Sequence, residues 1–100
     1  MDVLATALDP EGRPVDLTRE RWDHIIGDGP NRVGHPELRS HRAAIMRAIR
    51  EPSRRLPGRI PNEEWFYLED AGPSRYLKVV VAFAAGRGQV ITAFARRSMP

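Results

Sequence analysis

The chain has 100 residues, no cysteine and a formal net charge of +3. Its length suffices for one core that buries roughly 60 to 70% of the unfolded chain's surface, and the lack of cysteine excludes disulfides, thiolate catalysis and cysteine zinc sites. Nothing at the N-terminus resembles a signal peptide, and the longest apolar run, Val79 to Ala85, is far shorter than the roughly 20 residues of a membrane helix. We therefore expect one domain over residues 1–100 without membrane contact, in the cytoplasm or delivered into a target cell's cytoplasm.

A β-hairpin is expected first. Val3 to Leu8 is apolar enough for an edge strand, and Asp9-Pro10-Glu11-Gly12 has strong turn chemistry, with proline presetting one dihedral and glycine accepting a positive one. Arg13 to Leu17 then returns as the second strand.

A first helix follows the hairpin. Thr18 is a typical N-cap residue, and the next residues place Trp22, Ile25 and Ile26 on one apolar stripe. On a helical wheel, His24 lies about 200° from Trp22 and points away from that stripe. His24 is therefore either a functional residue or a solvated one, and not core filler.

A second helix is expected from Pro36 to about Arg50, after a turn over Gly27 to Gly34 and before Pro52 stops it. His35 stands near its N-terminal cap, so a capping role competes with a chemical one. We interpret His41 as structural. The buried face of this helix is formed by Leu38, Ile45, Met46 and Ile49.

The second half of the chain predicts an antiparallel meander. Trp65 to Glu69, Tyr76 to Ala84 and Gln89 to Arg96 have strand composition, and the turns between them are too short for crossovers. Prolines confine any strand in Ser53 to Asn62 to an edge. We expect an α+β fold, with the N-terminal hairpin and two helices packed on an antiparallel sheet of about four strands.

Period-2 alternation sorts the residues of the strongest strand by face. Leu77, Val79, Val81 and Phe83 form an apolar face that should meet the helices. Lys78, the only lysine, then projects onto the face that the helices leave uncovered. In the last strand, Val90, Thr92, Phe94 and Arg96 should share a face, and the register decides whether Lys78 joins it. We assign Trp22, Trp65 and Phe94 to the core.

Short motifs follow one another along nearly all of the chain: Leu17-Thr18, Trp22-x-His24-Ile25, His35-Pro36-Glu37-Leu38, Trp65-Phe66-Tyr67, Leu77-Lys78-Val79-Val80-Val81 and Val90-Ile91-Thr92-Ala93-Phe94. In order and spacing they resemble the phage-associated branch of the barnase, EndoU, colicin and RelE-like (BECR-fold) nucleases. The resemblance implies two helices packed on an antiparallel sheet and a metal-independent ribonuclease that acts as a toxin or effector, without a cofactor. It also implies RNA as a partner and an antitoxin or immunity protein as another.

The resemblance places His24, His35, Lys78 and Thr92 at positions where such proteins tend to keep polar residues. Similar sequences usually carry an arginine beside the histidine, and here Arg32 or Arg59 would substitute for it. The basic residues number sixteen, fifteen of them arginine, whose planar guanidinium suits phosphate recognition.

Metal-free RNA cleavage needs a base for the 2′-OH proton, an acid for the leaving 5′ oxygen and fixed positive charge near the phosphorane. An imidazole has an ordinary pKa near 6.5, so His24 and His35 suit the first two roles. For the remaining roles, we expect Lys78 or the arginines Arg59 and Arg96 to stabilise the phosphate, Thr92 to donate a hydrogen bond, and Tyr67 to stack a base or orient a phosphate.

Several alternatives remain open from the sequence. Lys78 on an uncovered face is often only a solvated charge, and threonine in a strand, as at Thr92, is usually there for its β-propensity. A metal site built from His24 and His35 with a neighbouring acid matches no known zinc spacing. The same fold would also serve a non-catalytic RNA- or protein-binding module, or a toxin subunit held in a neutralising complex.

Overall fold

A computed structural model describes residues 2–28 and 34–100 and has an α+β architecture. The strands are β1 (Val3–Leu8), β2 (Pro14–Thr18), β3 (Arg54–Pro57), β4 (Glu63–Glu69), β5 (Tyr76–Ala84) and β6 (Arg87–Arg96). The helices are α1 (Arg19–Ile26), the short 3₁₀ helix η1 (Pro36–Leu38) and α2 (Arg42–Arg50). In these described residues, no helix has both the length and the apolar composition that crossing a membrane requires.

The strands form one mixed sheet in the order β1-β2-β6-β5-β4-β3. The expected sheet of about four antiparallel strands is therefore wrong in strand count and in direction, because the N-terminal hairpin joins the sheet through a parallel pairing of β2 with β6. Val15 and Leu17 of β2 are fully buried, and this alternating pattern holds the hairpin in the plane of the sheet. The backbone edge of β2 then pairs with β6 at Val15–Gly88 and Asp16–Gln89.

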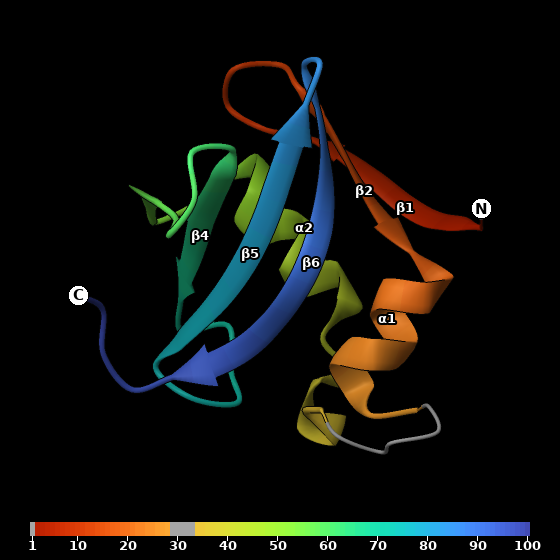
Figure 1. Cartoon of the computed structure of the whole chain (residues 1–100). Coiled ribbons are helices and arrows are strands. Elements are labelled where there is room, and N and C mark those ends of the chain that lie inside the picture. Colours follow the sequence, from red (N-terminus) through yellow and green to blue (C-terminus); the bar gives the residue numbers. More distant parts are fainter. Residues whose placement is uncertain (1, 29–33) are drawn as a thin grey trace.

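One face of the sheet carries the core. The buried side chains of α2, including Ile45 and Ile49, pack with Phe66 of β4 and with Leu77 and Val79 of β5, as the alternation in β5 predicted. Figure 1 looks onto the opposite face, with α2 behind the sheet and α1 beside β6. We call this opposite side, which carries Lys78 and which α2 does not cover, the open face.

Helix α1 has the predicted ends. The Thr18 side chain accepts a hydrogen bond from the Arg21 backbone N–H at 3.2 Å, and Gly27 closes the helix with a φ of 76°. The left-handed conformation suits glycine because it has no Cβ.

The single helix expected from Pro36 to Arg50 is wrong, because the chain breaks it into η1 and α2. The Leu38 and Arg39 backbone N–H groups donate to His35 and Pro36 three residues earlier, at 2.9 and 3.1 Å, which is the 3₁₀ pattern. The break turns the chain so that both Leu38 and Ile45 are fully buried.

Candidate functional site

Strand register decides which side chains share the open face with Lys78. Lys78 is opposite Tyr67 of β4 on one side and opposite Phe94 of β6 on the other. Directly opposed residues point to the same face, and alternation adds Thr92 and Arg96 to it. The sheet thus brings together four of the residues that the sequence analysis selected, Tyr67, Lys78, Thr92 and Arg96.

A register shift in the β5–β6 pair corrects one expectation. Val80 opposes Thr92, but Val81 opposes Val90, which leaves Ile91 as the extra residue. Val90 is therefore fully buried in the core and does not share the face of Thr92.

The ammonium of Lys78 is enclosed by aromatic rings. Its Nζ atom lies 3.4 Å from the ring centre of Trp65, 5.3 Å from that of Phe94 and 5.9 Å from that of Tyr67. The residue is 7% exposed, so it is not a solvated charge. Burial lowers the pKa of Lys78, and the positive charges of Arg96 and Arg59 lower it further.

Trp65 and Phe94 lie on the open face and not in the core, to which the sequence analysis assigned them. The Trp65 indole N–H donates to Glu63 Oε1 at 2.9 Å, which fixes the ring over Lys78. The same oxygen accepts the Arg59 backbone N–H at 3.3 Å. A Cβ on Gly58 would lie 2.5 Å from the Glu63 side chain, so glycine is needed there to admit this carboxylate.

Tyr67 has a different role from the one expected. Its side chain is almost fully buried, with 1% of its surface exposed, and it therefore has no free ring face on which a base could stack. Burial raises the pKa of the Tyr67 phenol, although the positive charges of Arg96 and Arg54 oppose this. The phenol therefore stays protonated near neutral pH, as a hydrogen-bond donor requires.

His35 reaches the open face from the N-terminal half of the chain. Its ring centre lies 5.6 Å from that of Phe94, and its Nδ1 atom lies 3.4 Å from Glu37 Oε1. The His35 backbone N–H donates to Ile25 O at 2.6 Å, which ties it to the end of α1. A Cβ on Gly34 would lie 2.6 Å from backbone atoms of α1, so this close approach depends on glycine.

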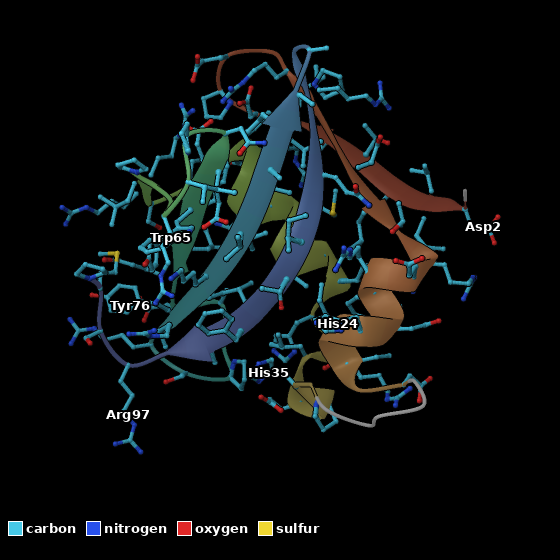
Figure 2. All side chains as sticks on the ribbon, in the orientation of Figure 1. Asp2, His24, His35, Trp65, Tyr76 and Arg97 are labelled. Carbon is cyan, nitrogen blue, oxygen red and sulfur yellow. The ribbon has the colours of Figure 1, made fainter. Side chains whose placement is uncertain are left out.

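His24 is an exposed residue one position before Ile25, the residue that anchors the His35 backbone. Figure 2 shows both histidines where α1 and η1 adjoin β6, while Trp65 lies toward β4. Within the described ranges, no side-chain hydrogen bond orients His24 or Thr92. Arg32, a predicted substrate-binding residue, lies outside the described residues.

Arg96 and Arg59 lie near Lys78, as expected of phosphate-binding residues, whereas His41 lies at a turn. The Arg96 guanidinium carbon lies 5.9 Å from the Phe94 ring centre, and Arg59 lies close enough to act electrostatically on Lys78. His41 instead faces the turn at Gly72, where a Cβ would lie 3.4 Å from its Nε2 atom.

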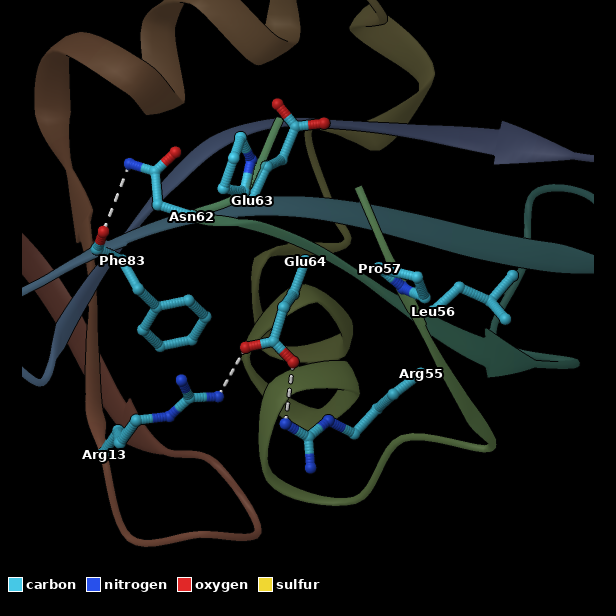
Figure 3. Close-up of a pocket in the computed structure, with 9 residues that line it drawn as sticks. Arg13, Arg55, Leu56, Pro57, Asn62, Glu63, Glu64 and Phe83 are labelled. Carbon is cyan, nitrogen blue, oxygen red and sulfur yellow. Dashed lines mark hydrogen bonds and ion pairs between the residues drawn. The ribbon is translucent and has the colours of Figure 1, made fainter. Parts of the chain in front are cut away.

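On the other side of the sheet, arginines are matched with carboxylates. Glu64 bridges Arg13 and Arg55 in a pocket of about 530 Å³ beside Phe83, as Figure 3 shows. The Arg13 guanidinium carbon lies 3.7 Å from the Phe83 ring centre, and the same side chain pairs with the buried Asp9 at 2.7 Å. This network fastens the β1–β2 turn to β3 and β4.

The open face has the opposite charge balance. Within residues 2–28 and 34–100, no carboxylate lies at ion-pair distance from Lys78, Arg54, Arg59 or Arg96. The Glu63 carboxylate acts electrostatically on Lys78 and offsets part of this charge, but the four cations outnumber it, so this face carries an excess of positive charge. An anionic ligand would supply the missing charge and hydrogen-bond acceptors.

Sequence reasoning missed Trp65, Phe94 and Glu63. The alternation of β4 held the signal, since fixing Phe66 and Leu68 in the core places Trp65 and Tyr67 beside Lys78.

In the part of the chain that the structure describes, no three His, Asp or Glu side chains are grouped closely enough to hold a metal ion. Comparison of the chain with protein-family models, with curated proteins and with solved structures finds no match.

Proposed function

We propose that the protein is a metal-independent endoribonuclease of the BECR type that acts in the cytoplasm. The observation that carries the proposal is a group of cations with no carboxylate at ion-pair distance among the described residues, around aromatic rings that also contact the His35 imidazole. The nuclease-like motif order supports it, as does the packing of α2 on the β3 to β6 meander.

The proposed reaction is attack of the 2′-OH on the adjacent phosphate. One of the imidazoles, His24 or His35, accepts the 2′-OH proton as the new P–O2′ bond forms, and the other donates a proton to the 5′ oxygen as the P–O5′ bond breaks. The products are a 2′,3′-cyclic phosphate and a 5′-hydroxyl. Lys78 and Arg96 stabilise the charge of the phosphorane, and the Thr92 hydroxyl donates to a non-bridging oxygen.

The test is cleavage of a labelled RNA in EDTA, with the product ends identified. We expect 2′,3′-cyclic phosphate and 5′-hydroxyl ends, and a fall of about 10²- to 10⁴-fold in kcat/KM for His35→Ala. His41→Ala is the matched control, because His41 faces the Gly72 turn, and its activity should be unchanged. Cleavage that requires added Mg²⁺ and yields 3′-hydroxyl ends would refute the proposal.

A non-catalytic RNA-binding module is the second candidate. The enclosure of the Lys78 ammonium by three rings favours it, since a cation at 7% exposure has limited access to a reacting phosphate. Tight, salt-dependent RNA binding without any cleavage after long incubation in EDTA would select this alternative.

A further inference from the structure

We infer that the substrate is unpaired RNA and that Trp65 is the platform on which one of its bases stacks. This inference rests on the proposed function, because it names the class of RNA that the same site accepts. It assigns to Trp65 the role that the sequence analysis gave to Tyr67.

Burial and neighbouring contacts together favour Trp65 among the rings of the open face. Tyr67 is 1% exposed and Tyr76 is 8% exposed, so neither offers a ring face to a ligand. Phe94 is also partly exposed, but unlike Trp65 it is contacted by the His35 ring and the Arg96 guanidinium. The Trp65 ring is partly exposed, and the Lys78 ammonium lies over the centre of one of its faces, so a base would stack on the other face.

The Trp65 indole is also held in place before any ligand binds. Its N–H is bonded to Glu63, whose carboxylate is in turn bonded to the loop backbone at Arg59. A ring that is already ordered loses little conformational entropy when a base stacks on it.

The positive charges near Trp65 indicate where the phosphates of the RNA would lie. Lys78 is 3.4 Å from the centre of the indole, and Arg59 and Arg96 act on the same ammonium. We therefore expect a nucleotide stacked on Trp65 to have its own phosphate near Lys78, Arg59 and Arg96. This is the pairing of aromatic ring and positive groove by which proteins bind single strands.

A base inside a duplex cannot use this platform, because its two faces are covered by its neighbours in the stack. Every unpaired base has a free face, and stacking discriminates weakly between bases. The site should therefore select for lack of pairing more than for sequence.

The two tryptophans make the inference measurable by fluorescence. Trp22 is 5% exposed in the core, so Trp22→Phe leaves Trp65 as the sole reporter and Trp65→Phe leaves Trp22. Both variants carry His35→Ala, which limits cleavage during titration. The probes are a short oligouridylate, an oligoadenylate and a blunt RNA duplex at equal phosphate concentration.

We expect both single strands to quench Trp65 and the duplex to leave it unchanged, while Trp22 responds to none of them. Trp65→Ala should weaken single-strand binding by about 5- to 150-fold, and Trp65→Phe should retain most of the affinity because it keeps a stacking ring. Trp22 emission in the Trp65 variants, and a cooperative urea transition in every variant, show that the proteins are folded.

Equal quenching by the duplex, or unchanged affinity in a folded Trp65→Ala, overturns the inference. Other outcomes separate the Trp65 inference from the nuclease proposal. Binding through Trp65 without cleavage by the unmodified protein leaves the inference standing and removes the enzyme, whereas equal cleavage of duplex and single strands leaves the enzyme and removes the inference.

Discussion

Replacing Lys78 with methionine should separate activity from stability. Methionine has a similar length and keeps contact with the aromatic rings through its polarisable sulfur, so Lys78→Met removes charge and little volume. The ammonium is 7% exposed and lacks a carboxylate partner in the described chain, and each ring contact contributes only about 0.5 to 2 kcal/mol. Removing a desolvated charge also removes the cost of its burial, which offsets the loss of these contacts.

We therefore expect the free energy of unfolding of Lys78→Met to lie within about 1 kcal/mol of the unmodified protein or above it. The rate of RNA cleavage should fall by about 10²- to 10³-fold, because a fixed charge at the phosphorane is lost. Urea unfolding followed by far-UV circular dichroism and kcat/KM on one RNA provide the two measurements. Arg19→Met, which removes an exposed charge on α1, is the control and should change neither.

The pH dependence gives an independent check on Lys78. Its native pKa lies below the ordinary value of 10.5, so between these two values the unfolded chain binds a proton that the native state lacks. The free energy of unfolding of the unmodified protein should therefore rise with pH in that window relative to Lys78→Met. Comparing the two proteins cancels the titration of Tyr67, which both contain. A fall of more than about 2 kcal/mol in Lys78→Met with unchanged activity would show that Lys78 is structural, against this reasoning.

Three further substitutions test other parts of the structure. Gly34→Ala places a Cβ 2.6 Å from backbone atoms of α1, so His35 should shift and kcat/KM should fall by about 10²-fold; activity like that of the unmodified protein would contradict the placement of η1. Ile49→Ala opens a cavity at a fully buried position and should lower the free energy of unfolding in urea by about 2 to 5 kcal/mol. A loss below about 1 kcal/mol would show that the core repacks to fill the cavity. The hydrogen bonds from Arg87 hold the pKa of Asp16 below its usual range, so Asp16→Asn should cost at most about 1 kcal/mol at neutral pH, given that Arg87 is 56% exposed. That difference should vanish as the pH falls through the lowered pKa of Asp16, and a difference that persists in acid would exclude the ion pair as its cause.

Local patterns predicted most of the individual elements. The Thr18 cap, the face of β5 that meets α2 and the meander of β4 to β6 all follow from capping chemistry and period-2 alternation. These signals are local, since each depends on residues a few positions apart. The parallel pairing of β2 with β6 was not predictable in the same way, because it joins Val15 to Gly88 across most of the chain.

The candidate site was predicted in part for the same reason. Lys78 was assigned correctly to the uncovered face, but Thr92 was grouped with Val90, which is buried in the core. The register that places Thr92 beside Lys78 depends on the extra residue Ile91, which has no sequence signature of its own. Trp65 was misassigned because large aromatic residues usually serve the core. Its position is decided by its neighbour Phe66, which occupies the core face of β4.

The junction between β2 and β6 is short, with pairing at two positions, and the hairpin leads directly into α1. A boundary with so few hydrogen bonds is where a protein opens locally before it unfolds globally. Backbone amides of β1 and β2 should therefore exchange with solvent faster than those in the centre of β5. Since α1 holds the backbone of His35 through Ile25, fraying at this junction would loosen the imidazole that contacts Phe94 of β6 while the central strands stay intact.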